Sequence, residues 1–405
     1  MKQGLLSDYF DGIAVKRLSA VEADPQKSHQ HEFAGGHLRG IFGEDDRKDI
    51  PTRFIWLNDE QEGISEPGMV SWYDSRRKQT HRGPEYRLYY ADNPVASLMR
   101  PGDSFFVATR PDGSVMVIVV PAGSTVESQL VWLFGIETQS EKDFFAKNEV
   151  DDSRLDFAAR YILDEIGIDA EEPEADKLDG LLEKYGTKFP TTAEFSKLAR
   201  ESLKDVSAED DADKVLMAWM EREELLFRRM ERRVVTDRLK SGFMSADAAD
   251  VDGFIAFSLS VQNRRKSRAG YSLENHLEAL LTGRKIKFQR GVETENKNKP
   301  DFLFPGQTEY RNPEFDTAKL TMLGSKSTCK DRWRQVLSEA SRIAHKHLLT
   351  LEPGISENQT DEMQAKQLQL VVPDSIQTTY KPAQKSRLMN VSQFIKLVEE
   401  RQSQL

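Results

Sequence analysis

The chain of 405 residues contains a single cysteine, Cys329. One cysteine excludes an intramolecular disulfide and a zinc site built from cysteines, and it fits a reducing, cytoplasmic environment. No run of about 18 apolar residues is present, so we expect no membrane-spanning helix. Residues 1–8 lack the apolar core of a secretory signal peptide. These absences together predict a soluble protein of the cytoplasm.

Positive charge is outnumbered. The chain has 57 Lys and Arg residues and 67 Asp and Glu residues, which gives a net charge of −10. That total argues at first against a nucleic-acid partner. The charges are segregated, however: acidic residues crowd the stretch 141–213, whereas basic residues cluster at 76–78, 264–268 and 330–334. Since local patches rather than the total set the affinity for phosphate, the acidic total does not exclude nucleic acid.

The first part of the chain, to about residue 140, has short apolar runs separated by turn residues, which suits a small barrel or sandwich. Two β-rich runs, 105–110 and 114–120, flank a Pro-Asp-Gly turn and predict a hairpin. We therefore expect a mostly β domain over 1–145. An acidic linker is expected over 146–184, with helices near 153–165 and 177–184.

The remaining part, 185–405, mixes helical spacing with short apolar runs. Helices are predicted over 211–240, 246–265, from Ser272 as an N-cap, 330–346 and 391–401. Strands are predicted at 286–289, 301–304, 320–323, 347–351 and 368–372. The pattern favours an α/β domain with a sheet flanked by helices.

Three charged residues in this part have a spacing that suggests chemistry. Asp301 opens a predicted strand, Lys326 ends another run 25 positions later, and Glu339 follows after 13 more, in the predicted helix 330–346. Two carboxylates can hold a hard divalent cation such as Mg²⁺, and a Lys can orient a water for phosphodiester hydrolysis. The alternative is a surface Asp, a Lys with its amino group in water and a solvated helix Glu.

Glu274 is a further candidate for the same metal site. It lies one helical turn before Glu278, so it either faces the site or makes a surface ion pair. Cys329 lies beside the candidate site, but no His spacing supports it as a nucleophile.

Three segments, 263–270, 299–305 and 329–335, closely resemble the EcoRII-like type II restriction endonucleases. The resemblance runs over roughly 185–405 and is weaker before residue 140. It implies a PD-(D/E)XK nuclease domain with a mixed sheet flanked by helices. It also implies that Asp301, Lys326 and Glu339 are catalytic, with Asp301 and Glu339 as ligands of Mg²⁺.

The resemblance also implies contacts with double-stranded DNA in this part. Lys330 and Asp331 fall where related enzymes read CC:GG; Lys can donate to guanine and Asp can accept from cytosine, the alternative being helix capping and phosphate positioning. Arg332, Arg264 and Arg265 are candidate DNA contacts, with a structural role as the alternative for the last two. Arg222 and Trp219 are candidates for stacking on an extruded base, although a Trp at helical spacing is more often core.

For 1–145 the resemblance implies a pseudobarrel effector domain that grips DNA with two loop arms. His29 and Gln30 would lie on the first arm, and Lys78, Arg82, Glu85 and Arg87 on the second. The alternative is an ordinary basic surface loop. If this domain blocks the catalytic cleft, its removal is expected to speed cleavage.

The resemblance thus implies a Mg²⁺-dependent homodimeric endonuclease that cuts a CCWGG-like site in double-stranded DNA. A cognate DNA methyltransferase would be its partner in a restriction-modification system, without direct contact. The alternatives are a DNA-binding regulator with an inactive nuclease-fold domain, and a nuclease acting on RNA or single strands.

Overall fold

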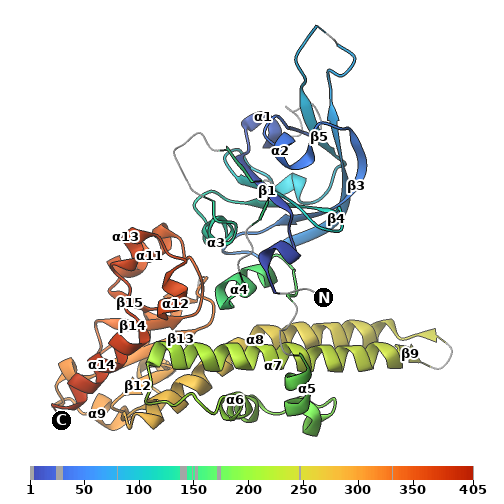
Figure 1. Ribbon diagram of the computed structural model, residues 1–405. Coiled ribbons are helices and arrows are strands. Elements are labelled where there is room, and N and C mark those ends of the chain that lie inside the picture. The colour runs from blue at the N-terminus through green and yellow to red at the C-terminus, as the bar shows by residue number, and fades with distance from the viewer. Residues whose placement is uncertain are drawn as a thin grey trace. The chain divides into compact units, whose positions relative to one another are not determined.

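The computed structural model describes residues 4–23, 31–79, 81–136, 144–147, 149–150, 154–170, 175–245, 248–330 and 332–404 (Figure 1). The chain forms two compact units, Met1–Glu171 with Pro353–Gln359, and Glu172–Glu352 with Thr360–Leu405. The boundary at 171 falls inside the segment predicted as a linker, which carries α4 (Phe157–Glu165) and α5 (Ala175–Leu182). Among the described residues, no helix combines the length and the apolar character needed to cross a membrane.

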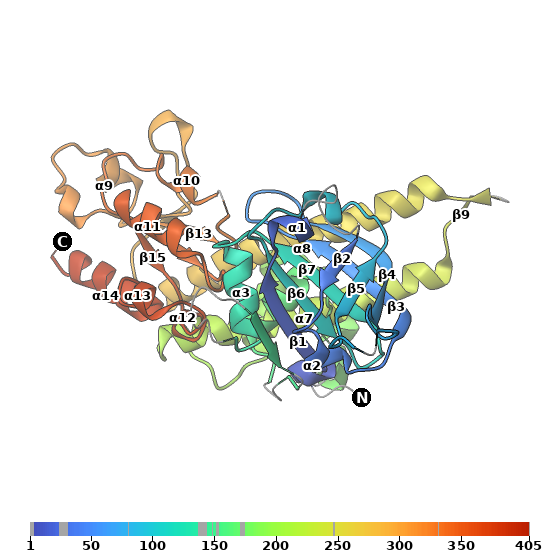
Figure 2. The ribbon, with the colours of Figure 1, turned by 90° about the horizontal axis from the view of Figure 1, so that it is seen from above.

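The first unit is built on one eight-stranded sheet of order β2-β5-β4-β3-β7-β6-β1-β8. All neighbours pair antiparallel except β3 and β7, which are parallel. Figure 2 shows most of these strands side by side. The strands are β1 (Gly12–Arg17), β2 (Glu32–Ala34), β3 (Arg47–Trp56), β4 (Ile64–Asp74), β5 (Tyr86–Tyr90), β6 (Ser104–Thr109), β7 (Val115–Val120) and β8 (Phe144–Lys147).

Strands β6 and β7 form the predicted hairpin, closed by a turn in which Gly113 has φ of +81°. Both faces of β7 are buried. Val117 belongs to a core with aromatic residues of β4 and β5, whereas Ile118 belongs to a second core. Helices α3 (Thr125–Leu133) and α4 cover that second core with apolar side chains at helical spacing. Alternation along each strand therefore places one core on each side of the sheet.

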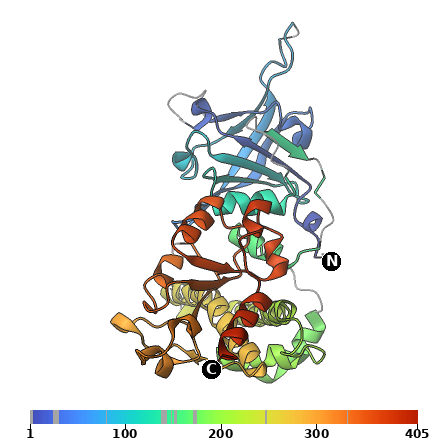
Figure 3. The ribbon, with the colours of Figure 1, turned by 90° about the vertical axis from the view of Figure 1, so that its left-hand side faces the viewer.

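The second unit holds a mixed five-stranded sheet of order β11-β12-β13-β14-β15, drawn orange to red in Figure 3. Strands β11 to β13 pair antiparallel, and β13 to β15 pair parallel. The strands are β11 (Gln289–Arg290), β12 (Phe302–Phe304), β13 (Thr321–Lys326), β14 (Lys346–Thr350) and β15 (Leu368–Val371). The predicted strand 286–289 is therefore reduced to a two-residue ladder at its end.

Helices flank this sheet, as the sequence predicts. The predicted helix 211–240 is observed as α7 (Ala212–Ser241), and the predicted helix 391–401 as α14 (Val391–Gln402). The other helices of the unit are α5, α6 (Thr192–Glu201), α8 (Val251–Gly283), α9 (Gln307–Arg311), α10 (Trp333–Val336), α11 (Glu357–Ala365, whose first turn belongs to the first unit), α12 (Asp374–Gln377) and α13 (Pro382–Lys385).

Two predicted helices, 246–265 and the one starting at Ser272, are a single helix, α8. Asp250 is its N-cap and accepts a hydrogen bond from the Gly253 amide at 2.9 Å. Ser272 is fully buried inside the helix, where its hydroxyl donates to Glu223 of α7. The serine was therefore wrongly interpreted as a cap, because its polar group serves packing between helices rather than a helix end.

The predicted helix 330–346 is also wrong, since among the residues that the structure describes in this stretch only α10 is helical. Ala340 adopts φ of +46°, outside the helical region. Lys346, the first residue of β14, is buried and its ammonium donates to the carbonyl of Ile343 at 2.7 Å. That carbonyl is thereby satisfied without a helix, and the chain turns directly into the strand.

Candidate active site

Asp301 and Lys326 meet at the ends of two neighbouring strands. Asp301 immediately precedes β12, and Lys326 is the last residue of β13, which pairs antiparallel with β12. The Lys326 Nζ donates to Asp301 Oδ2 at 2.6 Å, and the backbone amide of Ser325 donates to the same oxygen at 2.7 Å. The side chain of Asp301 is only 17% exposed, and that of Lys326 only 10%. The ion pair is therefore fixed by backbone pairing and shielded from solvent.

Glu339 completes the group, although it does not lie on a helix as predicted. It lies in a turn three residues after α10 ends at Val336. Burial, and then the negative charge of Asp301, raise the pKa of Glu339 to about 7. Its buried Oε2 has no hydrogen-bond partner among the described residues. An unpaired, half-buried carboxyl beside a second carboxylate is costly unless a positive charge is present.

Side chains from a preceding loop hold the turn that carries Glu339. The Asn298 amide donates to the carbonyl of Ser338 at 2.8 Å. Glu295 accepts from the backbone amide of Ser341 at 3.2 Å and from the Tyr310 hydroxyl at 2.7 Å. These positioning residues are not apparent from the sequence, since nothing in the pattern links a loop near 295 to a turn near 340.

Asp301 and Glu339 fit a hard divalent cation. The described residues contain no group of three His, Cys, Asp or Glu side chains placed to hold a metal ion. A Mg²⁺ ion is commonly held by one or two carboxylates, keeping waters and taking substrate phosphate oxygens for its other positions. The unsatisfied Oε2 of Glu339 is consistent with such a ligand.

Glu274 is not available as the extra metal ligand that the sequence suggested. Its Oε2 accepts from Arg290 Nη2 at 2.6 Å, and Arg290 also pairs with Glu278 at 2.8 Å. Arg290 lies on β11, the edge strand of the sheet, so both carboxylates of α8 pair with a residue of that edge. This is the ion-pair alternative for Glu274.

The segment after Lys326 is a turn rather than a helix start. Cys329 is fully buried, its backbone amide donates to Glu352, and burial raises the pKa of its thiol, so it has no nucleophilic character. Lys330 follows with φ of +34° and a half-buried side chain, and Arg332 is exposed. Asp331 lies outside the described residues. The turn thus presents Lys330 and Arg332 next to Lys326 in sequence.

The arginines of the helical layer have protein partners. Arg265 Nη2 pairs with the buried Glu231 at 2.5 Å, and the Arg264 guanidinium lies 4.3 Å from the ring centre of Phe189. These contacts favour the structural alternative for both arginines. Arg222, on α7, is half-buried.

The stacking candidate Trp219 is 4% exposed and packs beside His276 at 5.8 Å between ring centres. It is therefore a core residue, and the interpretation as a base-stacking residue is wrong.

In the first unit, the candidate arm joins β4 to β5. Lys78 and Arg82 are exposed there. Glu85 and Arg87 are paired with each other at 2.5 Å, and Arg76 also pairs with Glu85 at 2.5 Å. His29 and Gln30 lie outside the described residues. The arm therefore combines exposed cations with a preformed ion-pair network at its base.

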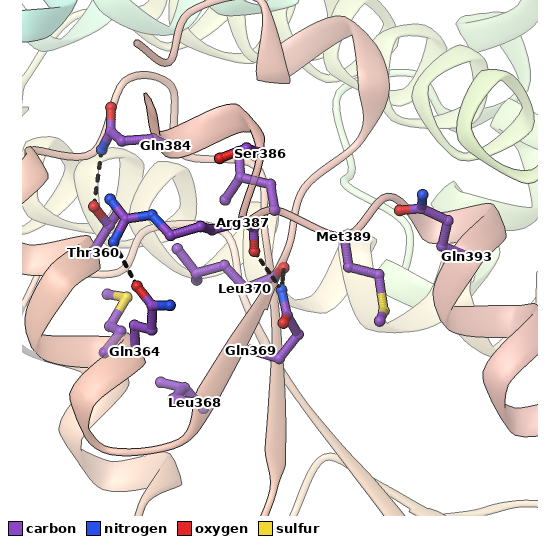
Figure 4. Close-up of a pocket in the computed structure, with 12 residues that line it drawn as sticks. Thr360, Gln364, Leu368, Gln369, Leu370, Gln384, Ser386, Arg387, Met389 and Gln393 are labelled. Atoms are coloured by element: carbon purple, nitrogen blue, oxygen red, sulfur yellow. Dashed lines mark hydrogen bonds between the residues drawn. The ribbon is translucent and has the colours of Figure 1, made fainter. Parts of the chain in front are cut away.

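A cavity of about 410 Å³ in the second unit is distinct from this site. Figure 4 shows Gln364, Gln369, Gln384 and Arg387 among its lining residues, none of which belongs to the candidate site. Their polar groups are occupied: Gln384 donates to Thr360 at 3.0 Å, and Arg387 donates to Gln364 at 2.5 Å. The cavity therefore offers little unsatisfied chemistry to a ligand.

Residues 227–395 match the family model described as EcoRII C terminal. Over 216 residues the chain is 41% identical to the type II restriction enzyme EcoRII of Escherichia coli, which covers 53% of this chain and 52% of that protein. The chain thus spans about half the length of this curated relative.

Among solved structures, metal-depleted Ecl18kI in complex with uncleaved, modified DNA is 18% identical with a TM-score of 0.45, covering 57% of this chain and 85% of that chain. A restriction endonuclease PspGI–substrate DNA complex is 16% identical with a TM-score of 0.44, covering 54% and 95%. Residues 227–395, the stretch that matches the family model, include Asp301, Lys326 and Glu339.

Proposed function

We propose that this protein is a type II restriction endonuclease that hydrolyses double-stranded DNA at a specific sequence with the aid of Mg²⁺. The observation that carries the proposal is the Lys326–Asp301 ion pair at 2.6 Å, with the unsatisfied carboxyl of Glu339 beside it. The 41% identity to a type II restriction enzyme over 216 residues supports the same reaction class.

Asp301 and Glu339 would hold the cation, which supplies Lewis-acid polarisation of the phosphate and a bound water of lowered pKa. The protein contributes the positioning. Oδ2 of Asp301 is held in place by two donors, the Lys326 ammonium and the Ser325 amide. Lys326, buried at the end of β13, can orient the attacking water and stabilise negative charge on the phosphate.

Glu339 must release its proton to act as a ligand. Burial raises its pKa to about 7, so a cation that binds near neutral pH competes with a proton for this carboxyl. Cation binding and proton release are thus linked at this residue, and higher pH favours the loaded site.

For recognition, we propose a CCWGG-like site read in part by Lys330 and Asp331, with Arg332 near the phosphates. A palindromic target suits a homodimer in which each subunit cuts one strand. The first unit would act as an effector domain that binds DNA through Lys78, Arg82, Glu85 and Arg87, together with His29 and Gln30.

The direct test is digestion of plasmid DNA by the purified chain with Mg²⁺, followed by run-off sequencing of the products. We expect discrete fragments with ends at one sequence, and no cutting by Asp301→Asn. Lys299→Ala is the matched control, since Lys299 is more than half exposed and pairs with Glu293 rather than with the site. Intact plasmid under all salt and metal conditions would instead favour a DNA-binding regulator with an inactive nuclease fold.

A further inference from the structure

Lys330 lies in a turn whose first residue is fixed. The Arg332 amide closes the turn by donating to the carbonyl of Cys329 at 2.7 Å. Cys329 and Trp333, which flank it, are both fully buried. Lys330 itself has φ of +34°, a backbone conformation that is uncommon for residues other than glycine. Such a conformation persists only where the surrounding contacts fix it, so the hold on Cys329 decides where Lys330 points.

Glu352 provides that hold. The backbone amide of Cys329 donates to Oε2 of Glu352, a residue that is only 4% exposed. The main chain of Glu352 is fixed as well. Its amide donates to Oγ1 of Thr350 at 3.1 Å, and its carbonyl accepts from the Tyr380 hydroxyl at 2.8 Å. Both of these partners are buried, so the carboxylate binds the turn from a rigid base.

The register of the sheet explains why Glu352 and Cys329 meet. Strands β13 and β14 run parallel, with Lys326 opposite Thr350 (Figure 1). The chain continues past both strands in the same direction, so Glu352, two residues after Thr350, lies level with the residues that closely follow Lys326. A Glu at this position is therefore placed by the fold to accept a hydrogen bond from the start of the turn.

Two carboxylates, one from each neighbouring strand, hold the end of β13. Asp301, which precedes β12, accepts from Ser325 and Lys326. Glu352, which follows β14, accepts from Cys329. Since β12 and β14 lie on opposite sides of β13, the chain between these contacts is tied on both sides. One carboxylate belongs to the candidate active site, and the other binds where the turn begins.

Glu352 has neither the exposure nor the neighbours for a direct role. It is too deeply buried to meet a base pair or a phosphate. Its Oε2 is already bound to the Cys329 amide, and the part of the chain that the structure describes includes no group of three His, Cys, Asp or Glu side chains placed to hold a metal ion. Burying a carboxylate is also costly, so it contributes little to stability alone. What this carboxylate provides is a fixed position for the turn.

We propose that Glu352 is a positioning residue for base recognition, because it holds the Cys329 amide and so sets the direction in which Lys330 leaves the turn. The inference deepens the proposed function, on which it rests for the role of Lys330 in reading a base pair. Glu352 acts as a hydrogen-bond acceptor. Gln has the same shape and a side-chain oxygen that also accepts, so it should replace Glu352, whereas Ala should not.

The first test measures how often the turn opens. Cys329 is the only cysteine of the chain, so the rate at which iodoacetamide modifies the folded, full-length protein reports the exposure of this turn. Without DNA or Mg²⁺, Glu352→Ala is expected to react at least about tenfold faster than wild type, and Glu352→Gln within about threefold of it.

Val398→Ala is the control for general destabilisation. Val398 is fully buried in α14, a helix that meets the start of β13, the end opposite to the turn, through a hydrogen bond from Arg401 to Leu320. Its truncation destabilises the same unit without touching the turn, so the reaction of Cys329 is expected to stay close to the wild-type rate.

The second test compares base preferences. Full-length protein selects from a randomised duplex library without Mg²⁺, and sequencing of the bound molecules gives the preference at each position. Lys330→Ala identifies the positions that Lys330 reads. Glu352→Ala is expected to lose preference at those same positions, by at least about fivefold, and to keep it elsewhere. The double variant is expected to lose no more than Lys330→Ala alone, because both changes act through one contact. Glu352→Gln and Val398→Ala are expected to keep the wild-type preference.

Three results would overturn the proposal: wild-type protection of Cys329 in Glu352→Ala, a loss of preference spread over all positions, or a double variant whose losses add. An unchanged preference in Lys330→Ala, or equal acceleration of the Cys329 reaction by Val398→Ala, would overturn it as well. A wild type that selects a sequence but cuts no DNA with Mg²⁺ would refute the proposed function alone. A wild type without any sequence preference would overturn both.

Discussion

The Nζ of Lys326 lies 2.6 Å from Oδ2 of Asp301, on the adjoining strand. The two side chains form an ion pair in a largely buried place. Lys326→Ala therefore removes a catalytic group and leaves a buried carboxylate unpaired. We expect cleavage to fall by at least about 10³-fold while DNA affinity changes by less than about tenfold. Single-turnover cleavage and filter binding measure the two quantities, and equal losses in both would contradict a catalytic role.

The raised pKa of Glu339 predicts how stability depends on pH without divalent cations. Between its usual pKa of 4.5 and about 7, folded Glu339 holds a proton that the unfolded chain has released. Stability from this group is therefore present below pH 4.5 and is lost as pH rises to about 7. Glu339→Gln cannot titrate, so on going from pH 5 to pH 8 it should gain about 1–2 kcal/mol relative to wild type, allowing for partial exposure.

Urea unfolding of wild type and Glu339→Gln at pH 5 and pH 8 measures that difference. Adding Mg²⁺ at pH 8 is expected to stabilise wild type more than Glu339→Gln, since only the carboxylate binds the ion. Parallel pH profiles for the two proteins would show that Glu339 does not titrate as described.

Lys330 is expected to govern sequence preference. Replacing it with Ala removes a donor to guanine, which costs about 1–3 kcal/mol of discrimination at one base pair. The measurement is cleavage of a library of oligonucleotides that vary each position of the preferred site. Arg332→Ala is the comparison. Loss of an exposed phosphate contact should weaken binding to all sequences alike and reduce the salt dependence of binding. If Lys330→Ala instead reduced cleavage of all sequences equally, Lys330 would contact the DNA backbone rather than a base.

Arg265 is expected to act on stability rather than on DNA. Its partner Glu231 has a side chain only 2% exposed, so Arg265→Ala leaves a buried carboxylate without its cation. We expect a loss of about 2–4 kcal/mol in the free energy of unfolding. Arg264→Ala removes only its contact with the ring of Phe189, for which about 1 kcal/mol is expected. If Arg265→Ala instead flattened the salt dependence of DNA binding, the residue would be a phosphate contact.

Arg82 tests the arm of the first unit. It is exposed, whereas Arg87 is paired with Glu85. Arg82→Ala should weaken DNA binding by the full-length chain and lower the slope of log affinity against log salt by about one. Arg53→Ala, also in the first unit but on β3, is the control and should leave the slope unchanged. If Arg82→Ala left the slope of log affinity against log salt unaltered, the arm would not contact DNA through this residue.

The sequence predicted the parts of the site that depend on local pattern. Asp301 and Lys326 stand at the ends of apolar runs, and antiparallel pairing of the two strands is enough to bring them together. Glu339 was assigned to a helix because the residues around it have helical spacing. The turn that actually holds it depends on Glu295 and Asn298, some 40 residues away, and such contacts leave no local pattern.

The same limit explains two other differences. Ser272 resembles an N-cap by residue type, but its partner is Glu223, 49 residues earlier, so α8 continues through it. Glu274 resembles a metal ligand by position, but its carboxylate forms an ion pair with Arg290 of β11. Both differences arise where a polar side chain is satisfied by a residue distant in sequence.

The unbroken length of α8 has a mechanical consequence. Its 33 residues extend over about 50 Å, and near one end Glu274 is bound to Arg290 of β11, which pairs with the strand that follows Asp301. An unbroken helix of this length transmits a displacement of its N-terminal end to the strands beside the site. Inserting one helical turn near that end would shift it by about 5 Å without altering any residue of the candidate site.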